Sequence, residues 1–581
     1  MDSQKSDNTL NLSQDATALE REKSMELLTG FNPVERTWDL IVKYYGDISS
    51  LEEYGAEIVY LSQQYAVITI KEQFIDVLEN MQQIIYIEKP KRLFFSVANA
   101  RRASCISGVQ VEGAVAGGSG LFGTGVICAC IDSGIDYMHP VFRNEDGSTR
   151  ILKIWDQSIS GNPPEGYRIG SVYDEEEINR AINASDSRER YSIVPSRDFS
   201  GHGTHVAGIM AGNFASNKNN NLGVATKSRL LVVKLGRAQE GGYPLTSELM
   251  QAVDFVIKQS QQYGMPVAIN LSFGNTYGSH DGTSLVETFI DAVIQQWQSV
   301  ICIGTGNEGN AAGHTSGYIV SDINADVQLA VGGYQQSFSI QIWKQYQDIF
   351  DIFFRGPSGR NYVLINSSSG TSRYNVDNNM LLVYYGEPSP YSPFQEIYID
   401  IIPDGDYVTE GIWQIELRPV RIVNGRYDMW LPSNQVLSSS TGFTRPGPDT
   451  TLTIPSTALN AISVGGYDSR NMSFADFSGR GYTRLIDIVK PDLVAPAVDI
   501  NSAEPGGTTG VRSGTSMATP FVTGSAALLM EWGIVRGNDR YLYGEKVKAY
   551  LIRGARGLPG EPVPSERQGW GALCLADSIP M

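Results

Sequence analysis

The run VICACID, residues 126–132, decides the fold class of this chain. It is apolar up to its last position, where Asp132 stands, and the turn residues Ser133 and Gly134 follow it. A strand that is apolar on both faces is typical of a buried parallel sheet, because helices cover both sides of such a sheet. Residues 126–132 are therefore expected to form a central strand of an α/β domain.

Three other apolar runs and four helical segments extend this pattern along the chain. The strand candidates are LLVVKL (230–235), VAINLSF (267–273) and VICIGTG (300–306), and helices are expected to start at His202, Ser247 and Ser284 and near Ser516. Short apolar strands that alternate with amphipathic helices predict a parallel sheet with helices on both faces.

The α/β pattern is interrupted between residues 321 and 440. Helical periodicity disappears there, and aromatic-rich runs such as SFSIQIW, IFDIFFR and EIYIDII recur at short intervals between Gly, Pro, Asn and Asp residues. This composition predicts an inserted all-β domain of the jelly-roll type. The α/β domain is thereby divided into residues 101–320 and 441–581.

The N-terminal part differs from both. Residues 1–23 are polar, charged and without aromatic residues, so they are predicted to be disordered. Residues 24–100 are predicted to form a small α+β unit, with strands at 38–45 and 65–71. Between residues 74 and 81 apolar side chains recur at helical spacing, which predicts a helix.

Composition excludes several classes of partner. The chain has 581 residues and a formal net charge of -18, which argues against a nucleic-acid partner and an anionic membrane surface. No apolar run is long enough for a membrane span, and the polar N-terminus shows no signal peptide. The 5 cysteines are odd in number and irregularly spaced, which favours buried thiols over a disulfide framework and predicts a reducing compartment.

Three polar residues stand where a sheet of this class places its ligands, at strand ends and helix starts. Asp132 ends a strand, His202 opens the segment GHGTHVAG, and Ser516 lies in SGTSMATP before an apolar helix. Taken singly, Asp132 also fits a turn and Ser516 a helix cap. His202 and His205 together would fit a metal site, but the pattern lacks the glutamate of a zincin helix and a third ligand, so no metal or other cofactor is expected.

An acid, an imidazole and a hydroxyl are the components of nucleophilic acyl transfer. A serine hydroxyl needs an adjacent base, and the imidazole needs a carboxylate that fixes its tautomer. The oxyanion needs hydrogen-bond donors, which the Asn307 side chain in GTGNEGN and the backbone N–H of Ser516 would supply. Asn307 fits a Gly-rich turn equally well from its own surroundings.

The segments ACIDSGI, GHGTHVAG, GTGNEG and SGTSMATP occur in the order in which subtilisin-like serine proteases carry their signatures, and the chain resembles that family. The resemblance implies that Asp132 orients, His202 acts as base and then acid, Ser516 attacks and Asn307 stabilises the oxyanion. It also implies that Ser272, Phe273 and Gly274 bind the backbone of a peptide substrate opposite Gly236, and that Glu308 lies at the mouth of the primary pocket.

Residues 24–100 resemble the inhibitory propeptide of these proteases, with cleavage expected between Val97 and Ser104. This propeptide, the absence of a visible signal sequence and the β insertion together resemble the Csp proteases of clostridial spores. The resemblance implies a protein or peptide substrate, the chain's own propeptide as a partner, activation of a cortex-lytic zymogen, and a cytoplasmic or spore-associated location.

Two alternatives remain open. One is a catalytically silent sensor or scaffold on a protease fold. The other makes the β insertion a module that binds carbohydrate or protein.

Overall fold

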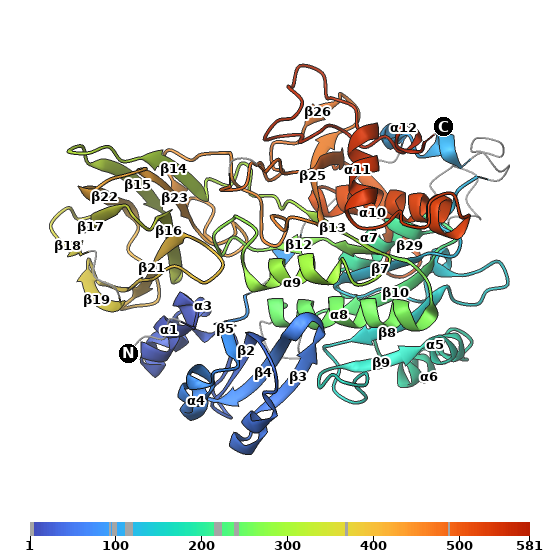
Figure 1. The fold of residues 1–581 in the computed structure, drawn as a ribbon, viewed down its shortest axis with the longest axis horizontal. Coiled ribbons are helices and arrows are strands. Elements are labelled where there is room, and N and C mark those ends of the chain that lie inside the picture. The colour runs from blue at the N-terminus through green and yellow to red at the C-terminus, as the bar shows by residue number, and fades with distance from the viewer. Residues whose placement is uncertain are drawn as a thin grey trace. The chain divides into compact units, whose positions relative to one another are not determined.

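The computed structural model describes residues 5–91, 94–95, 102–110, 120–213, 223–236, 243–366, 370–485 and 488–580. The chain divides into two compact units. Unit 1 consists of residues 1–92, 275–285 and 308–454, and unit 2 of residues 93–274, 286–307 and 455–581. The chain therefore passes from one unit to the other five times (Figure 1).

Unit 2 contains the parallel sheet that the apolar runs predicted. Its strand order is β26-β25-β13-β11-β7-β10-β8-β9, with β27 also paired to β25. The central strands β25, β13, β11, β7, β10 and β8 run parallel, whereas β26 and β9 at the ends are antiparallel to their neighbours. The strands are β7 (Ile127–Asp132), β8 (Ile151–Asp156), β9 (Ser171–Asp174), β10 (Arg229–Lys234), β11 (Val267–Leu271), β13 (Ser299–Gly304), β25 (Ile462–Asp468), β26 (Ser473–Phe474) and β27 (Leu493–Pro496).

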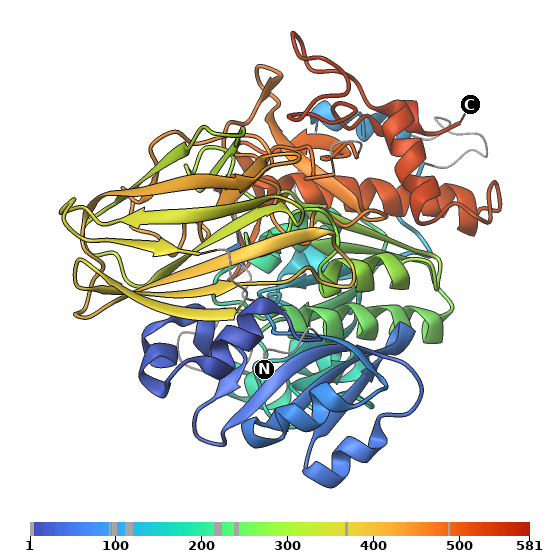
Figure 2. The ribbon, with the colours of Figure 1, turned by 60° about the vertical axis from the view of Figure 1, so that its left-hand side comes forward.

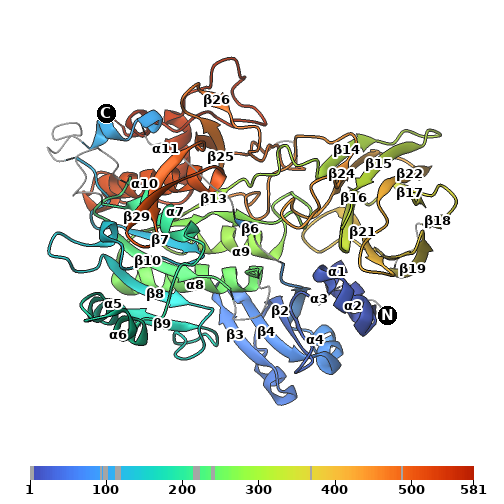
Figure 3. The same cartoon turned by 180° about the vertical axis from the view of Figure 1, so that it is seen from behind.

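Helices cover both faces of this sheet. Helices α7 and α10 pack against one face and against each other, and α8 lies on the other with α9 beside it (Figures 1 and 3). The expected parallel sheet with helices on both faces is thereby confirmed. The helices of unit 2 are α5 (Glu175–Ile182), α6 (Ser187–Ile193), α7 (His202–Ala211), α8 (Thr246–Tyr263), α9 (Leu285–Val293), α10 (Thr515–Met530), α11 (Glu545–Gly554) and α12 (Leu575–Ser578), and its short strand pairs are β6 (Phe94–Phe95) with β12 (Phe273–Gly274) and β28 (Ile500–Glu504) with β29 (Thr508–Arg512).

The helix that carries Ser516 is the most apolar long helix in the described part of the chain. Residues Thr515–Val535 have a mean hydropathy of 1.2 and are long enough to cross a membrane by composition alone. In this structure 89% of that window is buried among the sheet and the neighbouring helices. Its apolar character is thus used in the core of unit 2.

Unit 1 contains two antiparallel sheets that share one apolar core (Figure 2). One sheet has the order β14-β23-β16-β21-β20-β19 and the other β18-β17-β22-β15-β24. The all-β character of the insertion agrees with expectation, whereas its jelly-roll topology stays a prediction. The strands are β14 (His314–Tyr318), β15 (Ala325–Val331), β16 (Phe338–Gln345), β17 (Ile349–Arg355), β18 (Tyr362–Ile365), β19 (Gly370–Val376), β20 (Asn379–Tyr385), β21 (Phe394–Pro403), β22 (Gly411–Arg421), β23 (Arg426–Trp430) and β24 (Gly442–Phe443).

The N-terminal α+β element also belongs to unit 1. Its sheet has the order β1-β2-β4-β3, with β5 paired to β2, and all these pairs are antiparallel. The elements are β1 (Phe31–Asn32), β2 (Thr37–Tyr44), β3 (Glu57–Leu61), β4 (Tyr65–Lys71), α4 (Ile75–Asn80) and β5 (Ile84–Glu88).

The prediction that residues 1–23 are disordered is wrong for the residues described from position 5 onward. Helices α1 (Asn8–Asp15) and α2 (Ala18–Lys23) form there, followed by α3 (Met25–Leu28). Asp7 caps α1, and Thr17 and Glu20 form a capping box on α2. Helices this short depend on tertiary packing, and Leu12, Ala16 and Leu27 pack against β20 and β21 within unit 1.

The cysteine prediction is also wrong in part. Cys105 and Cys574 form a disulfide across a sequence separation of 469 residues. Cys128, Cys130 and Cys302 are buried free thiols. Burial raises the pKa of Cys128 to about 11, so this thiol stays protonated near neutral pH.

The segment 275–285 follows the strand β12 directly and is held inside unit 1. The backbone N–H of Asn275 donates to the carbonyl of Ile454 at 2.9 Å, and that of Ile454 donates to Asn275 at 2.8 Å. The imidazole of His280 stacks on Trp430, with ring centres 4.2 Å apart. The C-terminal part of the insertion is thus tied to the segment that leaves β12.

Candidate active site

Asp132 and His202 come together because a helix start meets a strand end. Asp132 is the last residue of β7 and His202 the first of α7. The approach needs a glycine at position 203, since a Cβ there would lie 2.1 Å from the carbonyl oxygen of Gly134. Nδ1 of His202 lies 2.7 Å from Oδ1 of Asp132, and both side chains are buried.

This contact assigns roles to the two ring nitrogens of His202. A carboxylate only accepts hydrogen bonds, so Nδ1 carries the proton and Nε2 is left with a lone pair. The backbone N–H of Ser133 donates to the same Oδ1 at 2.7 Å and holds the carboxylate in place. An imidazole fixed in this tautomer can accept a proton at Nε2.

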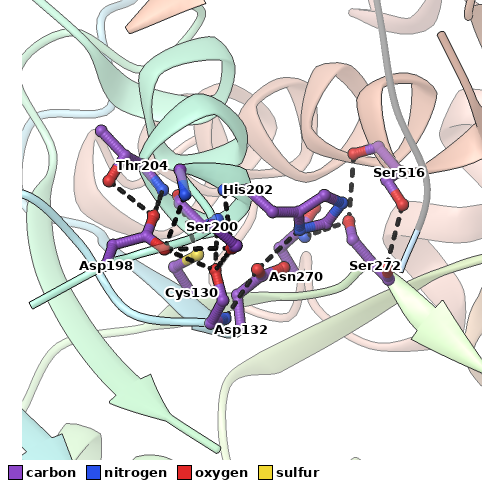
Figure 4. Close-up of polar contacts among 12 residues, drawn as sticks. Cys130, Asp132, Asp198, Ser200, His202, Thr204, Asn270, Ser272 and Ser516 are labelled. Atoms are coloured by element: carbon purple, nitrogen blue, oxygen red, sulfur yellow. Dashed lines mark hydrogen bonds and ion pairs between the residues drawn. The ribbon is translucent and has the colours of Figure 1, made fainter. Parts of the chain in front are cut away.

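Ser516 lies on the other side of the imidazole, as Figure 4 shows. It is the second residue of α10 and is buried. Its Oγ donates to the backbone carbonyl of Ser272 at 2.8 Å. The side chain of Ser272 donates in turn to the carbonyl of Ser516 at 3.0 Å, and Asn270 donates to that hydroxyl at 2.7 Å. These bonds tie the nucleophile to the strand that leads into β12.

Asn307 is oriented by the residue that precedes Ser516. Its Oδ1 accepts from the backbone N–H of Thr515 at 3.2 Å and from the Thr515 hydroxyl at 3.3 Å. The hydroxyl of Thr515 also accepts from the N–H of Gly306 at 3.1 Å. These donors engage the oxygen of the amide, and among the described residues the Nδ2 donors of Asn307 have no hydrogen-bond partner.

Strand β12, which is expected to bind the backbone of a substrate, is already paired with a segment from the N-terminal part of unit 2. Phe273 pairs with Phe95 and Gly274 with Phe94 in an antiparallel ladder between β12 and β6. This is the pattern of β-strand addition, in which an extended peptide uses the edge of a sheet. Ser272, one residue before β12, contacts Ser516 directly.

Gly236 and Glu308 fit the sequence expectation less well. Gly236 follows β10 with φ of +108°, and the facing strand expected at 234–242 continues into 237–242, outside the described residues. Glu308 does not present a free carboxylate at a pocket mouth, which corrects the expectation. It is buried and accepts from the Ser433 hydroxyl at 2.7 Å and the Asn434 N–H at 3.3 Å, and burial raises its pKa.

Sequence inspection missed Asp198, which joins the strand end to the helix start. Its Oδ1 accepts from the Ser133 hydroxyl at 2.8 Å, the Gly201 N–H at 2.9 Å and the Ser200 hydroxyl at 3.1 Å. Its Oδ2 accepts from the N–H and hydroxyl of Thr204 at 2.8 and 2.7 Å. The only sequence signal is an acid shortly before a helix start, where carboxylates favour the helix dipole.

His205 has a structural environment. Its Nε2 lies 3.1 Å from the carbonyl oxygens of both Ile500 and Gly510, so this nitrogen carries a proton and ties α7 to the β28–β29 hairpin. Burial lowers the pKa of His205 to about 3, so the ring is neutral. A protonated nitrogen that faces two carbonyls is not a metal ligand.

Comparison with known proteins agrees with this geometry. Residues 4–91 match the model of the Csp protease B prodomain, and residues 123–430 and 424–571 match the model of the subtilase family. The structure of the Clostridium perfringens CspB protease is similar at 36% identity and a TM-score of 0.74, over 82% of this chain and 96% of that one.

Two curated relatives match over shorter or more distant stretches. Subtilisin amylosacchariticus from Bacillus subtilis subsp. amylosacchariticus is 42% identical over 109 residues, 18% of this chain and 26% of its own length. The minor extracellular protease Vpr of Bacillus subtilis (strain 168) is 21% identical over 494 residues, 79% of this chain and 52% of that protein. The match thus spans about a quarter of the subtilisin and about half of Vpr. The subtilase model covers well over half of the sequence, and the chain belongs to the subtilase family.

Proposed function

We propose that this chain is a serine endopeptidase that hydrolyses peptide bonds through an acyl-enzyme on Ser516. The observation that carries the proposal is the hydrogen bond of 2.7 Å between His202 and Asp132 on the side of the imidazole away from Ser516 (Figure 4). This arrangement leaves Nε2 of His202 as the base for the Ser516 hydroxyl.

In the proposed reaction Oγ of Ser516 attacks the scissile carbonyl while Nε2 of His202 takes its proton. Asp132 stabilises the imidazolium that forms. Nδ2 of Asn307 and the backbone N–H of Ser516, at the N-terminus of α10, donate to the oxyanion. The imidazolium then protonates the leaving amine, and water activated by His202 hydrolyses the acyl-enzyme.

The propeptide is proposed to be the first substrate. Phe94 and Phe95 pair with the strand next to Ser516 in the direction of an extended substrate. A substrate that keeps this register presents the residue after Phe95 opposite Ser272, so we expect cleavage between Ser96 and Val97. This bond borders the interval 97–104 expected from sequence, of which residues 97–101 lie outside the described residues.

The physiological substrate is proposed from the relatives alone. The similarity to the CspB protease and the match to its prodomain support a role in spore germination, through activation of a zymogen such as a cortex hydrolase. The cytoplasmic or spore-associated location stays a prediction.

A silent scaffold remains the second candidate, because β6 occupies the edge that a substrate needs. Labelling of the purified protein by a fluorophosphonate separates the two. Label on Ser516 requires an accessible, activated hydroxyl, whereas a permanently covered site takes none.

The test of the main proposal compares wild type with Ser516→Ala. Wild type is expected to yield a processed chain whose N-terminal sequence starts at Val97, and to hydrolyse peptides in trans. The variant is expected to stay full length and to lose hydrolysis by about 10⁶-fold. Hydrolysis by the variant at the wild-type rate would contradict the proposal. Ser525→Ala, a buried serine further along the same helix, is the matched control.

A further inference from the structure

A pocket of about 550 Å³ lies next to the catalytic residues within unit 2. Its wall includes Ile135, three residues after Asp132, and Phe199, three residues before His202. The rest of the wall includes Arg190 of α6, Arg197, and Pro505 at the tip of the β28–β29 hairpin. The pocket is therefore built from the loops that also set the positions of the acid and the base.

The pocket lies beyond the imidazole as seen from Ser516. Asp198 contributes to its wall, and Figure 4 shows Asp198 on the side of His202 opposite Ser516. The propeptide strand, in contrast, pairs with residues 273–274, next to Ser272 on the Ser516 side. Because the imidazolium protonates the leaving amine, the half of the substrate that departs lies on the side of His202. The pocket is thus placed for the residues that follow the scissile bond.

Two guanidinium groups in the pocket have unused hydrogen-bond capacity. Within the described residues, neither Arg190 nor Arg197 forms a side-chain hydrogen bond or ion pair, and Nε of Arg190 is buried without a partner. Arg197 stacks on Tyr191 at 3.5 Å from the ring centre, which orients its planar group. Lys234, whose ammonium is 5.4 Å from the ring centre of Phe199, is engaged by Asp156 at 3.7 Å and by the Arg197 carbonyl at 2.8 Å.

The two carboxylates of the pocket are engaged elsewhere. Asp136 accepts from the N–H of Met138 at 3.0 Å and from the N–H of Gly506 at 2.9 Å. Asp198 accepts five hydrogen bonds from the ends of β7 and α7. These acids lower the net positive charge of the pocket, but among the described residues neither forms an ion pair with Arg190 or Arg197. The donors left over are those of Arg190 and Arg197, and a carboxylate is the partner that matches a guanidinium.

We propose that this pocket binds an acidic side chain in the substrate segment that follows the scissile bond. The proposal rests on the proposed endopeptidase function and specifies the class of substrate that the site takes. Phe199, 83% exposed, flanks the cations with apolar surface that covers the aliphatic part of a bound glutamate. On a chain with a net charge of -18, this is a local site for an anionic group.

The chain's own processing site does not carry such a group. The segment after Phe95, SVANARRASC, holds Arg101 and Arg102 and no acidic residue. Self-processing is therefore expected not to need this pocket. The new N-terminal segment, which carries Arg101 and Arg102, is expected not to bind there after cleavage. Processing in cis and hydrolysis in trans respond differently to changes in the pocket, which separates this inference from the proposed function.

The experiment uses two peptide series that carry Glu or Gln at each of the four positions after the scissile bond. Wild type is expected to favour Glu by at least tenfold in kcat/KM at one or more positions, and Arg190→Gln/Arg197→Gln is expected to bring that ratio close to one. Arg190→Glu/Arg197→Glu should prefer Lys at the same position. Arg188→Gln, on the exposed side of α6, is the matched control and should behave as wild type. Self-processing should be retained in all of them.

Equal kcat/KM for the Glu and Gln peptides in wild type would overturn the proposal. A preference for Glu that persists in Arg190→Gln/Arg197→Gln would overturn it as well. Affinities of the Glu and Gln product peptides, measured by fluorescence anisotropy on the purified protein whether or not it has been processed, provide a readout that does not depend on turnover. Loss of all hydrolysis with a retained preference for the Glu product would refute the endopeptidase function and leave the pocket assignment standing.

Discussion

Pro520 stands four residues after Ser516 in α10 and lacks the N–H that would bond the carbonyl of Ser516. Because of the proline, the carbonyl of Ser516 has no donor at this position of the helix. The hydroxyl of Ser272, which precedes β12, donates to it at 3.0 Å instead. The relationship couples the position of Ser272 to that of Ser516.

Removal of this hydroxyl is expected to cost stability. Ser272→Ala leaves a buried carbonyl without a donor, which should lower the free energy of unfolding by about 1–3 kcal/mol in urea titrations. Pro520→Ala restores an N–H at the right position, so the double variant Ser272→Ala/Pro520→Ala should regain part of the loss. A double variant no more stable than Ser272→Ala would show that the helix does not use the restored donor.

Asp198→Asn is expected to disturb the geometry of the catalytic pair. Loss of a buried charged acceptor costs about 1.5–3 kcal/mol per hydrogen bond, which corresponds to about 10- to 100-fold in kcat with little change in KM. Steady-state kinetics of the purified variant against wild type measure this loss. Asp186→Asn removes a similar cap from α6, where Asp186 accepts from two backbone N–H groups, and should leave kcat unchanged.

Asn307→Leu is expected to reduce kcat by about 10²- to 10³-fold, the size reported for loss of such a donor in subtilisin. The side chain keeps its approximate volume and loses the Nδ2 donors. Fluorophosphonate labelling, which reports activation of the Ser516 hydroxyl, should be reduced far less than peptide turnover in a folded variant. An unchanged kcat would remove Asn307 from the oxyanion site.

Asp400 makes the stability of unit 1 depend on pH. The carboxyl is buried in β21, and burial raises its pKa from 3.8 to about 7. The native state therefore favours the protonated acid, so this contribution is complete below about pH 4 and is lost as pH rises to about 7. Asp400→Asn should flatten the decline of the unfolding midpoint between about pH 4 and about pH 7, whereas Asp406→Asn, at an exposed position, should not.

The sequence predicted the elements whose signal is local. The apolar run 126–132 corresponds to β7 at Ile127–Asp132, and the runs at 230–235 and 300–306 lie within two residues of β10 and β13. Burial on both faces of a parallel strand leaves a continuous apolar run, which can be recognised without knowledge of its neighbours. The positions of Asp132, His202 and Ser516 at strand and helix ends follow from the same pattern.

The features that escaped prediction depend on residues far apart in the chain. Helix α1 gains its stability from β20 and β21, more than 350 residues later, and its own sequence carries a weak apolar pattern. The partner of Cys105 lies 469 residues away, and an odd number of cysteines offered several pairings. The role of Asp198 rests on hydrogen bonds to two separate elements, which a single acid in a sequence does not reveal.

The exchange of backbone hydrogen bonds between Asn275 and Ile454 limits how this protein can be engineered. A domain inserted as one continuous segment could be deleted without loss of other contacts. Unit 1, however, also contains residues 275–285, the segment that follows β12. Deletion of 308–454 would strip that stretch of its partners and fuse Asn307 to Pro455. Chimeras that swap the β domain between relatives should therefore exchange residues 275–285 with it.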